Sequence, residues 1–330
     1  MDSADTKNLA NKPPKGLYII FILLAALAGF FYGARTNGLF ACQPPDAIAT
    51  EYVGTCNVTQ FGDYDHGALW FGLEAEAQQA AATATVLFVG NSRIQFGLSS
   101  EDFDEWFNTQ ALTFYLLGFS HTENYSFFKP LLEKIQPRAR LYVINIDGFF
   151  EKELTGPANS VMNDPQSLNR YKQKRYWQKV QGAVCGPMSS LCGNASSYVR
   201  KRSNGMWVFH GADFLARTDF RDRPLPVDWS VDEGIVDRYQ QRAIEFFDQI
   251  PADRNCIVLT NVPNFETTIG TADALAKKLR LPLVAPQMEG LTTFDGSHLT
   301  TESADRWANG FITALGPYLH RCLSGSDSQL

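Results

Sequence analysis

Motifs that define several common enzyme classes are missing from this chain. It has no C-x-x-C pair for a zinc or thioredoxin-like site, and no Walker loop or G-x-G-x-x-G run for a nucleotide. It also has no G-x-S-x-G elbow, which disfavours an α/β-hydrolase. Acidic residues outnumber basic ones by 35 to 29, for a formal net charge of -6, whereas a nucleic-acid binder needs a dominant basic face. We therefore expect no cofactor, no metal ion and no nucleic-acid partner.

An uncharged run of nineteen residues lies near the N-terminus, at residues 16–34 (GLYIIFILLAALAGFFYGA). A helix of this length, at about 1.5 Å per residue, just spans a hydrocarbon core of roughly 30 Å. Three lysines precede the run, at positions 7, 12 and 15, and only Arg35 follows it closely. The positive-inside rule then predicts a cytoplasmic tail at residues 1–15, a single-pass transmembrane anchor at 16–34 and an extracytoplasmic main domain.

A cleaved signal peptide is the alternative interpretation of the same run. Ala26-Leu27-Ala28 resembles a cleavage site, which would release the domain from the membrane. Phe30, Phe31 and Tyr32 extend the apolar run beyond that site, so the sequence favours an uncleaved signal anchor.

Cysteine usage agrees with export, because all six cysteines lie beyond the apolar run. Proximity in the sequence suggests three disulfides: Cys42 with Cys56, Cys185 with Cys192, and Cys256 with Cys322. Spacing alone does not choose among the connectivities, and buried free thiols are a further alternative.

The chain beyond the anchor divides by composition into a lead-in and a main domain. Residues 35–83 are rich in glycine, proline and small polar residues, and we interpret them as a stalk and lead-in. Residues 84–323 alternate short apolar runs with amphipathic segments, which predicts an α/β fold with a mostly parallel sheet and helices on both faces. The expected strands are residues 86–89, 112–117, 141–146, 256–260 and 283–285. A C-terminal tail, residues 324–330, completes the chain.

Helix starts can be assigned from capping patterns. Ser99, three residues before Asp102, is expected to open a helix, and Ser230 with Glu233 forms a clearer capping box. The last helix is expected to begin near Thr301.

Between about residues 151 and 229 the alternation breaks, and we interpret this segment as an insertion without a strong strand. Tyr171, Tyr176 and Trp177 lie there among eight basic residues, and residues 165–202 hold no acidic one. The basic residues are Arg170, Lys172, Lys174, Arg175, Lys179, Arg200, Lys201 and Arg202. Such a surface fits anionic lipid head groups or an anionic or sugar polymer. A solvated loop with incidental charge is the alternative.

A serine stands where the first strand of the expected sheet ends, in Gly90-Asn91-Ser92. Ligands of open α/β sheets bind outside the carboxyl ends of the strands, so Ser92 is well placed to meet a substrate. The glycine permits a tight turn, and backbone N–H groups after it can face a developing oxyanion.

An aspartate and a histidine near the C-terminus supply the groups that a serine nucleophile needs. Asp295 and His298 lie three residues apart in FDGSHLT, after the last expected strand and before the last helix, and so at the same edge of the sheet as Ser92. We expect Asp295 to hold Nδ1 of His298 while Nε2 reaches Ser92 and takes its proton.

A strand that ends in a G-x-S turn, together with a D-x-x-H before a final helix, resembles the SGNH (GDSL-like) hydrolase superfamily, in its membrane-anchored extracytoplasmic type. The resemblance covers about residues 83–323 without the insertion. It implies a flavodoxin-like three-layer αβα sandwich and ester hydrolysis or acyl transfer. It also implies that Ser92 is the nucleophile, His298 the base and Asp295 the residue that orients it. Gly118, in LLGFS, matches the family's glycine oxyanion donor beside the backbone of Ser92.

Three positions depart from the family's pattern. Asn91 replaces the usual aspartate, and Arg93 is bulky and charged where small residues are common. In the third block, Asn145-Ile146-Asp147-Gly148, Asp147 occupies the place of an asparagine donor, and an ionised carboxylate cannot donate to an oxyanion. Asn145 is expected to substitute, with Asn261 as the alternative. Candidate substrate contacts are Asn91, Arg93, His121, Asp147 and Asn261.

Two functions follow. The first is a serine-dependent esterase or O-acyltransferase that acts on acyl, in the first instance acetyl, esters of a cell-envelope polysaccharide. Its partners would be the lipid bilayer, the acylated glycan and a membrane acyl-donor protein. The second is a catalytically inactive module that binds polymer or partner proteins at the membrane surface through its basic insertion. Water and sugar hydroxyls compete for the same acyl intermediate, so the motif does not separate hydrolysis from transfer.

Overall fold

The computed structural model describes residues 15–38, 40–41, 51–54, 63–194, 197–210 and 223–324. Its centre is a parallel four-stranded sheet in a mixed α/β fold, with strand order β3-β2-β4-β7. The strands are β2 (Val86–Asn91), β3 (Phe114–Phe119), β4 (Leu141–Asn145) and β7 (Ile257–Thr260). Every residue of these strands is buried, as expected for parallel strands that are covered on both faces.

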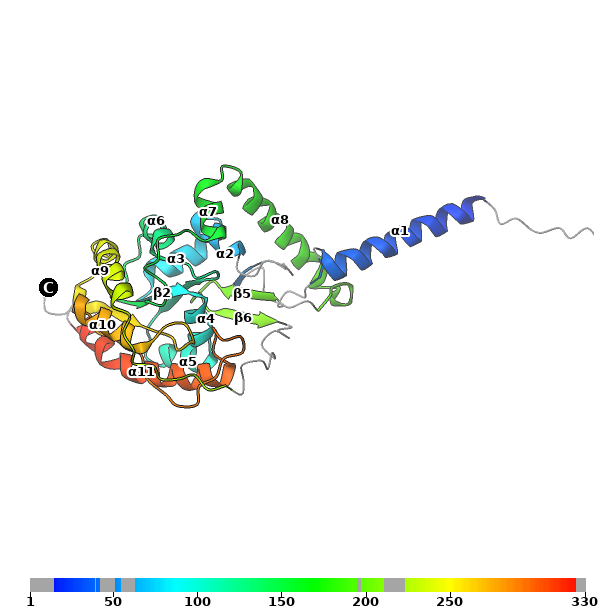
Figure 1. Cartoon of the computed structure of the whole chain (residues 1–330). Coiled ribbons are helices and arrows are strands. Elements are labelled where there is room, and N and C mark those ends of the chain that lie inside the picture. Colours follow the sequence, from blue (N-terminus) through cyan, green and yellow to red (C-terminus); the bar gives the residue numbers. More distant parts are fainter. Residues whose placement is uncertain are drawn as a thin grey trace, which may run out of the picture.

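Helices cover both faces of this sheet, and alternate strand residues contact each set (Figure 1). Leu87 and Val89 join one apolar cluster, whereas Val86 and Phe88 join the other. The first cluster includes buried residues of α2 (Asp63–Trp70), α3 (Ala75–Thr83), α6 (Tyr125–Ile135), α7 (Gly156–Asn163), α9 (Glu233–Phe247) and α10 (Ile269–Leu279). The second includes those of α4 (Ser92–Leu98), α5 (Glu101–Thr109) and α11 (Thr301–Ser324).

Four of the five expected strands are present, with shifted ends. The second begins at Phe114, two residues later than expected, and the first extends to Asn91. The expected fifth strand is reduced to an isolated parallel bridge between Leu283 and Leu259. Pro282 precedes this bridge and Pro286 soon follows it, and proline lacks the N–H that a longer ladder would need.

The expected helix starts were correct for the last helix and displaced for two others. Ser99 is the C-cap of α4, where its N–H donates to the Gln95 carbonyl, and Ser100 caps α5 instead. Asp232, not Ser230, caps α9 by accepting a hydrogen bond from the N–H of Ile235 at 2.9 Å.

The lead-in and the insertion both contain structure that the sequence pattern did not predict. Within residues 35–83, α2 and α3 contribute buried side chains to the first apolar cluster. The insertion holds α8 (Ser167–Cys185), a 3-10 turn η1 (Ser189–Leu191), and strands β5 (Ser197–Lys201) and β6 (Trp207–His210). With β1 (Tyr52–Val53), these strands form an antiparallel sheet in the order β1-β5-β6. These strands are too short to give a clear hydrophobic pattern, and β5 also contains Ser197, Arg200 and Lys201.

Among the residues that the structure describes, ion pairs use at least five of the eight basic residues in the insertion, so the expectation of one free basic surface was too simple. The pairs are Arg170 with Asp164, Arg175 and Arg202 with Glu74, Arg200 with Asp65, and Lys201 with Asp104. Arg200 is fully buried, and its guanidinium also donates to the carbonyl oxygens of Leu116 and Gly118 in β3. The insertion is therefore bound to the lead-in and to the central sheet by buried charge.

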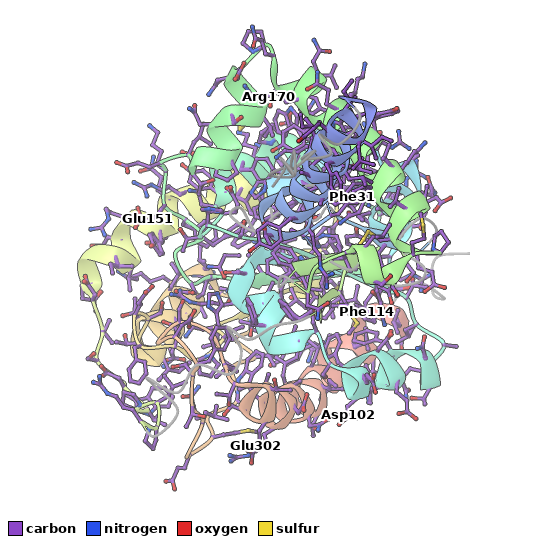
Figure 2. The ribbon with its side chains drawn as sticks, turned by 90° about the vertical axis from the view of Figure 1, so that its right-hand side faces the viewer. Phe31, Asp102, Phe114, Glu151, Arg170 and Glu302 are labelled. Atoms are coloured by element: carbon purple, nitrogen blue, oxygen red, sulfur yellow. A yellow bond between two sulfur atoms is a disulfide. The ribbon has the colours of Figure 1, made fainter. Side chains whose placement is uncertain are left out.

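The N-terminal helix α1 (Lys15–Asn37) projects away from the domain (Figure 1). The most apolar 18-residue stretch within residues 16–36 has a mean hydropathy of 2.3 and no buried residue, so the helix is long and apolar enough to cross a membrane. Figure 2 shows Phe31 of α1 and Arg170 of α8 in the upper half of the view, with Asp102 of α5 and Glu302 of α11 at its base.

Two of the three expected disulfides are present, Cys185–Cys192 and Cys256–Cys322. The first joins the end of α8 to the residue after η1, and the second joins the residue before β7 to α11. The expected Cys42–Cys56 pair lies outside the described residues.

Replacing Asp65 by asparagine should destabilise the fold by about 3–5 kcal/mol, because it leaves the buried Arg200 guanidinium without a counter-charge. Urea unfolding of the full chain in detergent, followed by tryptophan fluorescence, measures this loss. Lys277→Ala, which removes an exposed i,i+4 pair with Asp273, is the control and should change the free energy of unfolding little. Equal effects of the two substitutions would contradict the prediction.

Candidate active site

Ser92 is the first residue of α4, directly after the last residue of β2. The side chain of Asn91 caps this helix by accepting a hydrogen bond from the Arg93 N–H at 2.9 Å. Glycine is required at position 90, because a Cβ there would lie 2.8 Å from Cβ of Asn145 in the neighbouring strand. Strand, cap and close packing thus fix the backbone from which the Ser92 hydroxyl projects.

Asp295 and His298 lie in a tight loop that leads into α11. Gly296 has φ +88°, a conformation that side chains rarely adopt, and the N–H of Phe294 donates to the His298 carbonyl at 3.0 Å. One carboxylate oxygen of Asp295, Oδ1, accepts hydrogen bonds from the N–H groups of Ser297 at 2.9 Å and His298 at 2.8 Å. The backbone of the loop therefore holds the Asp295 carboxylate in place independently of its contact with the imidazole.

A continuous line of hydrogen bonds joins the three side chains. The second carboxylate oxygen of Asp295, Oδ2, lies 2.8 Å from Nδ1 of His298, and Nε2 of the same ring lies 2.8 Å from Oγ of Ser92. The carboxylate holds a proton on Nδ1, which leaves a lone pair on Nε2 to accept the hydroxyl proton. Two segments 206 residues apart in sequence meet here at the carboxyl edge of the sheet.

The ionised form of Asp295 is favoured in this setting. Partial burial raises the pKa of the carboxyl group, but the His298 hydrogen bond and charge, together with the two backbone N–H donors, lower it further than burial raises it. The net effect is a pKa below the ordinary value. Two aromatic rings that also contact each other pack against the imidazole, with Phe96 at 4.4 Å between ring centroids and Phe294 stacked at 5.7 Å.

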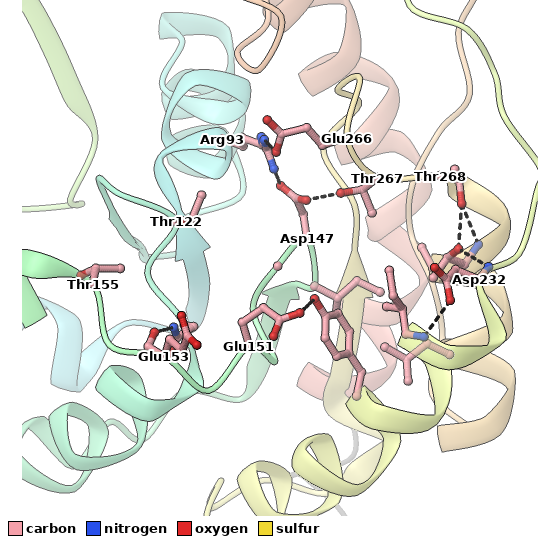
Figure 3. A pocket seen from close by; sticks show the side chains of 18 of the residues that line it. Arg93, Thr122, Asp147, Glu151, Glu153, Thr155, Asp232, Glu266, Thr267 and Thr268 are labelled. Carbon is pink, nitrogen blue, oxygen red and sulfur yellow. Dashed lines mark hydrogen bonds and ion pairs between the residues drawn. The ribbon is translucent and has the colours of Figure 1, made fainter.

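Arg93, the residue after the serine, is almost fully buried and bonds to three other segments (Figure 3). Its guanidinium pairs with Asp147 and with Glu266, and Nε donates to the Ser297 hydroxyl at 2.9 Å. Asp147 also accepts a hydrogen bond from the hydroxyl of Thr267. The two positions that depart most from the family pattern, Arg93 and Asp147, are therefore partners of each other. Both charges are neutralised next to the triad.

The expected oxyanion donors have defined surroundings. Gly118 lies beside Gly90 in the parallel register, and a Cβ at Gly118 would come within 2.7 Å of the Ile94 side chain. The amide of Asn145 has partners of its own, because Oδ1 accepts from the Val262 N–H at 3.1 Å and Nδ2 contacts Oδ1 of Asn91 at 3.4 Å. The second contact is at the long end of the hydrogen-bond range, so Nδ2 is weakly held.

The remaining candidate contacts lie in three different places, after β7, after β3 and at the end of β2. Asn261 is buried just after β7, and its Oδ1 has no hydrogen-bond partner among the described residues. His121 is exposed after β3 with φ +66°, and its Nδ1 lies 2.7 Å from the Ser120 hydroxyl. Asn91 donates through Nδ2 to the Asp147 carbonyl at 3.0 Å, so it holds the third block in place rather than facing solvent.

A cavity of about 1220 Å³ lies next to Arg93 (Figure 3). Its walls include six acidic residues: Asp147, Glu151, Glu153, Asp232, Glu233 and Glu266. Arg93 and His121 also line it, but Ser92 and His298 do not. Arg93 therefore touches both the triad loop, through Ser297, and the cavity. The sequence analysis missed Phe96, Ser297, Glu266 and Thr267, because only the folded chain brings them to the site.

No group of three or more potential metal ligands occurs among the residues that the structure describes. Comparisons of the chain with protein-family models, with curated proteins and with solved structures found no match.

Stability at low pH tests the role of the Asp295 carboxylate. Its pKa is lower in the folded chain than in the unfolded one, so ionisation stabilises the fold above the ordinary value of about 4. This stabilisation is lost as the pH falls through the lowered pKa. Between about pH 5 and pH 3, unfolding free energies should fall more steeply for the parent than for Asp295→Asn. Equal slopes would show that the carboxylate is not favoured as an anion.

Proposed function

We propose that this chain is a serine-dependent acyl esterase or O-acyltransferase of the SGNH (GDSL-like) type, with a flavodoxin-like three-layer sandwich. Its substrates are acyl esters, in the first instance acetyl esters, of a cell-envelope glycan. The observation that carries the proposal is the hydrogen-bonded line from Ser92 through His298 to Asp295. A nucleophile, a base and a group that orients the base are the minimum set for acyl transfer to a serine.

The reaction would proceed through an acyl-serine intermediate. Oγ of Ser92 attacks the ester carbonyl while Nε2 of His298 takes its proton, and Asp295 stabilises the resulting imidazolium. The imidazolium then protonates the leaving alcohol, and the acyl group stays on Ser92. Water or a sugar hydroxyl, deprotonated by His298, releases it. The backbone N–H groups of Ser92 and Gly118, with the Asn145 amide, are the proposed donors to the oxyanion.

Location supports a glycan substrate. The apolar helix α1 and two disulfides fit a membrane anchor with its main domain outside the cytoplasm, with the N-terminus inside as the lysine distribution predicts. A cell-surface polymer and a membrane protein that delivers the acyl group would both reach such a domain. The acidic cavity beside Arg93 suits a segment rich in hydroxyl groups more than an anionic polymer.

A catalytically inactive module that binds polymer or partner proteins at the membrane surface is the second proposal, and one observation favours it. Asp147 is paired with Arg93 and Thr267, and the Asn145 amide contacts Asn91 and Val262. If no donor replaces them, the oxyanion would lose stabilisation worth about 10²–10³ in rate.

A serine-reactive probe separates the two proposals. The full chain should be labelled by a fluorophosphonate and should hydrolyse a chromogenic acetate ester, and Ser92→Ala should abolish labelling and lower kcat/KM by at least about 10³-fold. Ser324→Ala, on the exposed end of α11, is the matched serine control and should retain both activities. A parent chain that resists labelling would favour the binding module.

The direction of acyl transfer is read from the glycan itself. In a strain that lacks the protein, the mass of isolated envelope glycan should shift by whole acetyl groups. More acetyl in the deletion strain indicates an esterase, and less indicates a transferase. An unchanged glycan would contradict both activities.

A further inference from the structure

The turn that follows α8, including η1, meets the C-terminal end of α1 and is fixed to it by close contacts. The Arg35 guanidinium donates to the Ser190 carbonyl at 3.0 Å, and the Gly193 N–H donates to the Phe40 carbonyl at 2.7 Å. A Cβ at Gly193 would lie 2.4 Å from the Arg35 carbonyl oxygen, so only glycine permits this approach. These contacts therefore fix the domain directly to the C-terminal end of α1.

Between the two helices lies an apolar wedge, a cavity of about 1010 Å³. Phe30 and Phe31 line it from α1, and Trp177, Val184, Met188 and Leu191 line it from α8 and the turn after it. Figure 1 shows the two helices diverging from their meeting point rather than packing along their lengths. The wedge thus opens outward, and its aromatic walls are exposed in the isolated chain, with Trp177 at 50% and Phe30 at 65%.

The exposed side of α8 has the composition of a helix at a membrane surface. Trp177, Val180 and Val184 recur at helical spacing and form one stripe that faces the wedge. On the neighbouring stripe Lys172 and Lys179 flank Tyr176, which is 62% exposed. Residues 165–202 contain no acidic side chain. Tryptophan and tyrosine concentrate at the interface between head groups and hydrocarbon, where lysine side chains reach the phosphates.

We propose that the wedge and the exposed face of α8 form a seat that lies in the lipid head-group layer around the end of α1. The bilayer is the occupant that the geometry favours, because the wedge is continuous with the membrane-crossing surface of α1 and opens where that span ends, near Thr36. Lipid chains would cover Phe31 and Trp177, and anionic head groups would neutralise Lys172 and Lys179. The seat fixes the orientation of the domain on the membrane and does not depend on catalysis.

Quenching by brominated lipid tests the seat. The full chain is placed, one copy per disc, in nanodiscs of phosphatidylcholine and phosphatidylglycerol with or without bromine on the acyl chains. Of the six tryptophans, the signal of Trp177 is obtained as the difference between the parent and Trp177→Phe. Brominated lipid should remove roughly half of this signal or more, as expected for an indole at the interface.

Matched variants show whether quenching is specific to the seat. Trp229, which is 59% exposed and leads into α9, is the matched control, and its signal, obtained with Trp229→Phe, should not be quenched. Phe31→Trp in the Trp177→Phe background reports the position of α1 and should be quenched. Ser92→Ala should behave like the parent, so failure of the catalytic proposal leaves this result unchanged.

Three outcomes would overturn the proposal. Quenching at position 31 without quenching of Trp177 would contradict the proposed seat but not the membrane span. The absence of quenching at both positions would contradict both the seat and the membrane span. Shielding of Trp177 from acrylamide only in discs that hold two copies would show that a second chain, not lipid, covers the wedge.

Discussion

The buried guanidinium of Arg93 connects the start of α4 to the segments after β4 and β7 and to the Asp295–His298 loop. The backbone N–H of Arg93 donates to the Asn91 side chain. The Arg93 side chain pairs with Asp147 after β4 and with Glu266 after β7. Its Nε donates to the Ser297 hydroxyl inside the Asp295–His298 loop. A buried charge is tolerated only with paired and hydrogen-bonded partners, so these contacts are mutually required. The position of the imidazole relative to Ser92 therefore depends on a residue that takes no part in proton transfer.

This interaction also explains two features that look unfavourable in the sequence alone. A bulky cation after the nucleophile and a carboxylate in place of an asparagine donor each seem to damage the site. Together Arg93 and Asp147 form one ion pair, with the Thr267 hydroxyl bonded to the second carboxylate oxygen. Removing Arg93 would leave the Asp147 carboxylate buried without its counter-charge, and removing Asp147 would leave Arg93 with the exposed Glu266 as its counter-charge.

The central sheet could be predicted because its strands are continuous apolar runs, and the convergence of Ser92 with His298 followed from parallel strands sharing a carboxyl edge. The contacts that hold the site could not be predicted in this way. Phe96, Ser297 and Glu266 carry no local signal, since their roles arise only from distant partners. The placement of Asn91 on Asp147 was equally invisible, because a side chain's direction depends on its neighbours.

The lead-in and the insertion were misjudged for a related reason. Contacts between residues distant in sequence tie them to the rest of the fold, among them Arg200 with Asp65 at a separation of 135 positions. A count of charges in residues 165–202 suggested a free basic surface, although Arg200 is fully buried and Arg202 nearly so. Charge patterns in a sequence show how many ions a segment has, but pairing decides how many remain for a ligand. In this insertion Lys174 lies over the Tyr171 ring, 5.0 Å from its centroid, and among the described residues Lys172 and Lys179 of α8 form no ion pair and lie beside the exposed aromatic residues.

The proton relay and the oxyanion donors have separate roles in the site. The relay is a local device: a loop holds Asp295, the aspartate holds one nitrogen of His298, and the other nitrogen meets Ser92. In the proposed reaction it would activate the Ser92 hydroxyl, but it would not stabilise the charge that develops on the carbonyl oxygen. Each missing donor there costs about 10²–10³ in rate, so even a fully formed relay can leave a slow enzyme. Whether the weakly held Nδ2 of Asn145 donates a hydrogen bond to the oxyanion would thus decide between the proposed enzyme and the proposed binding module.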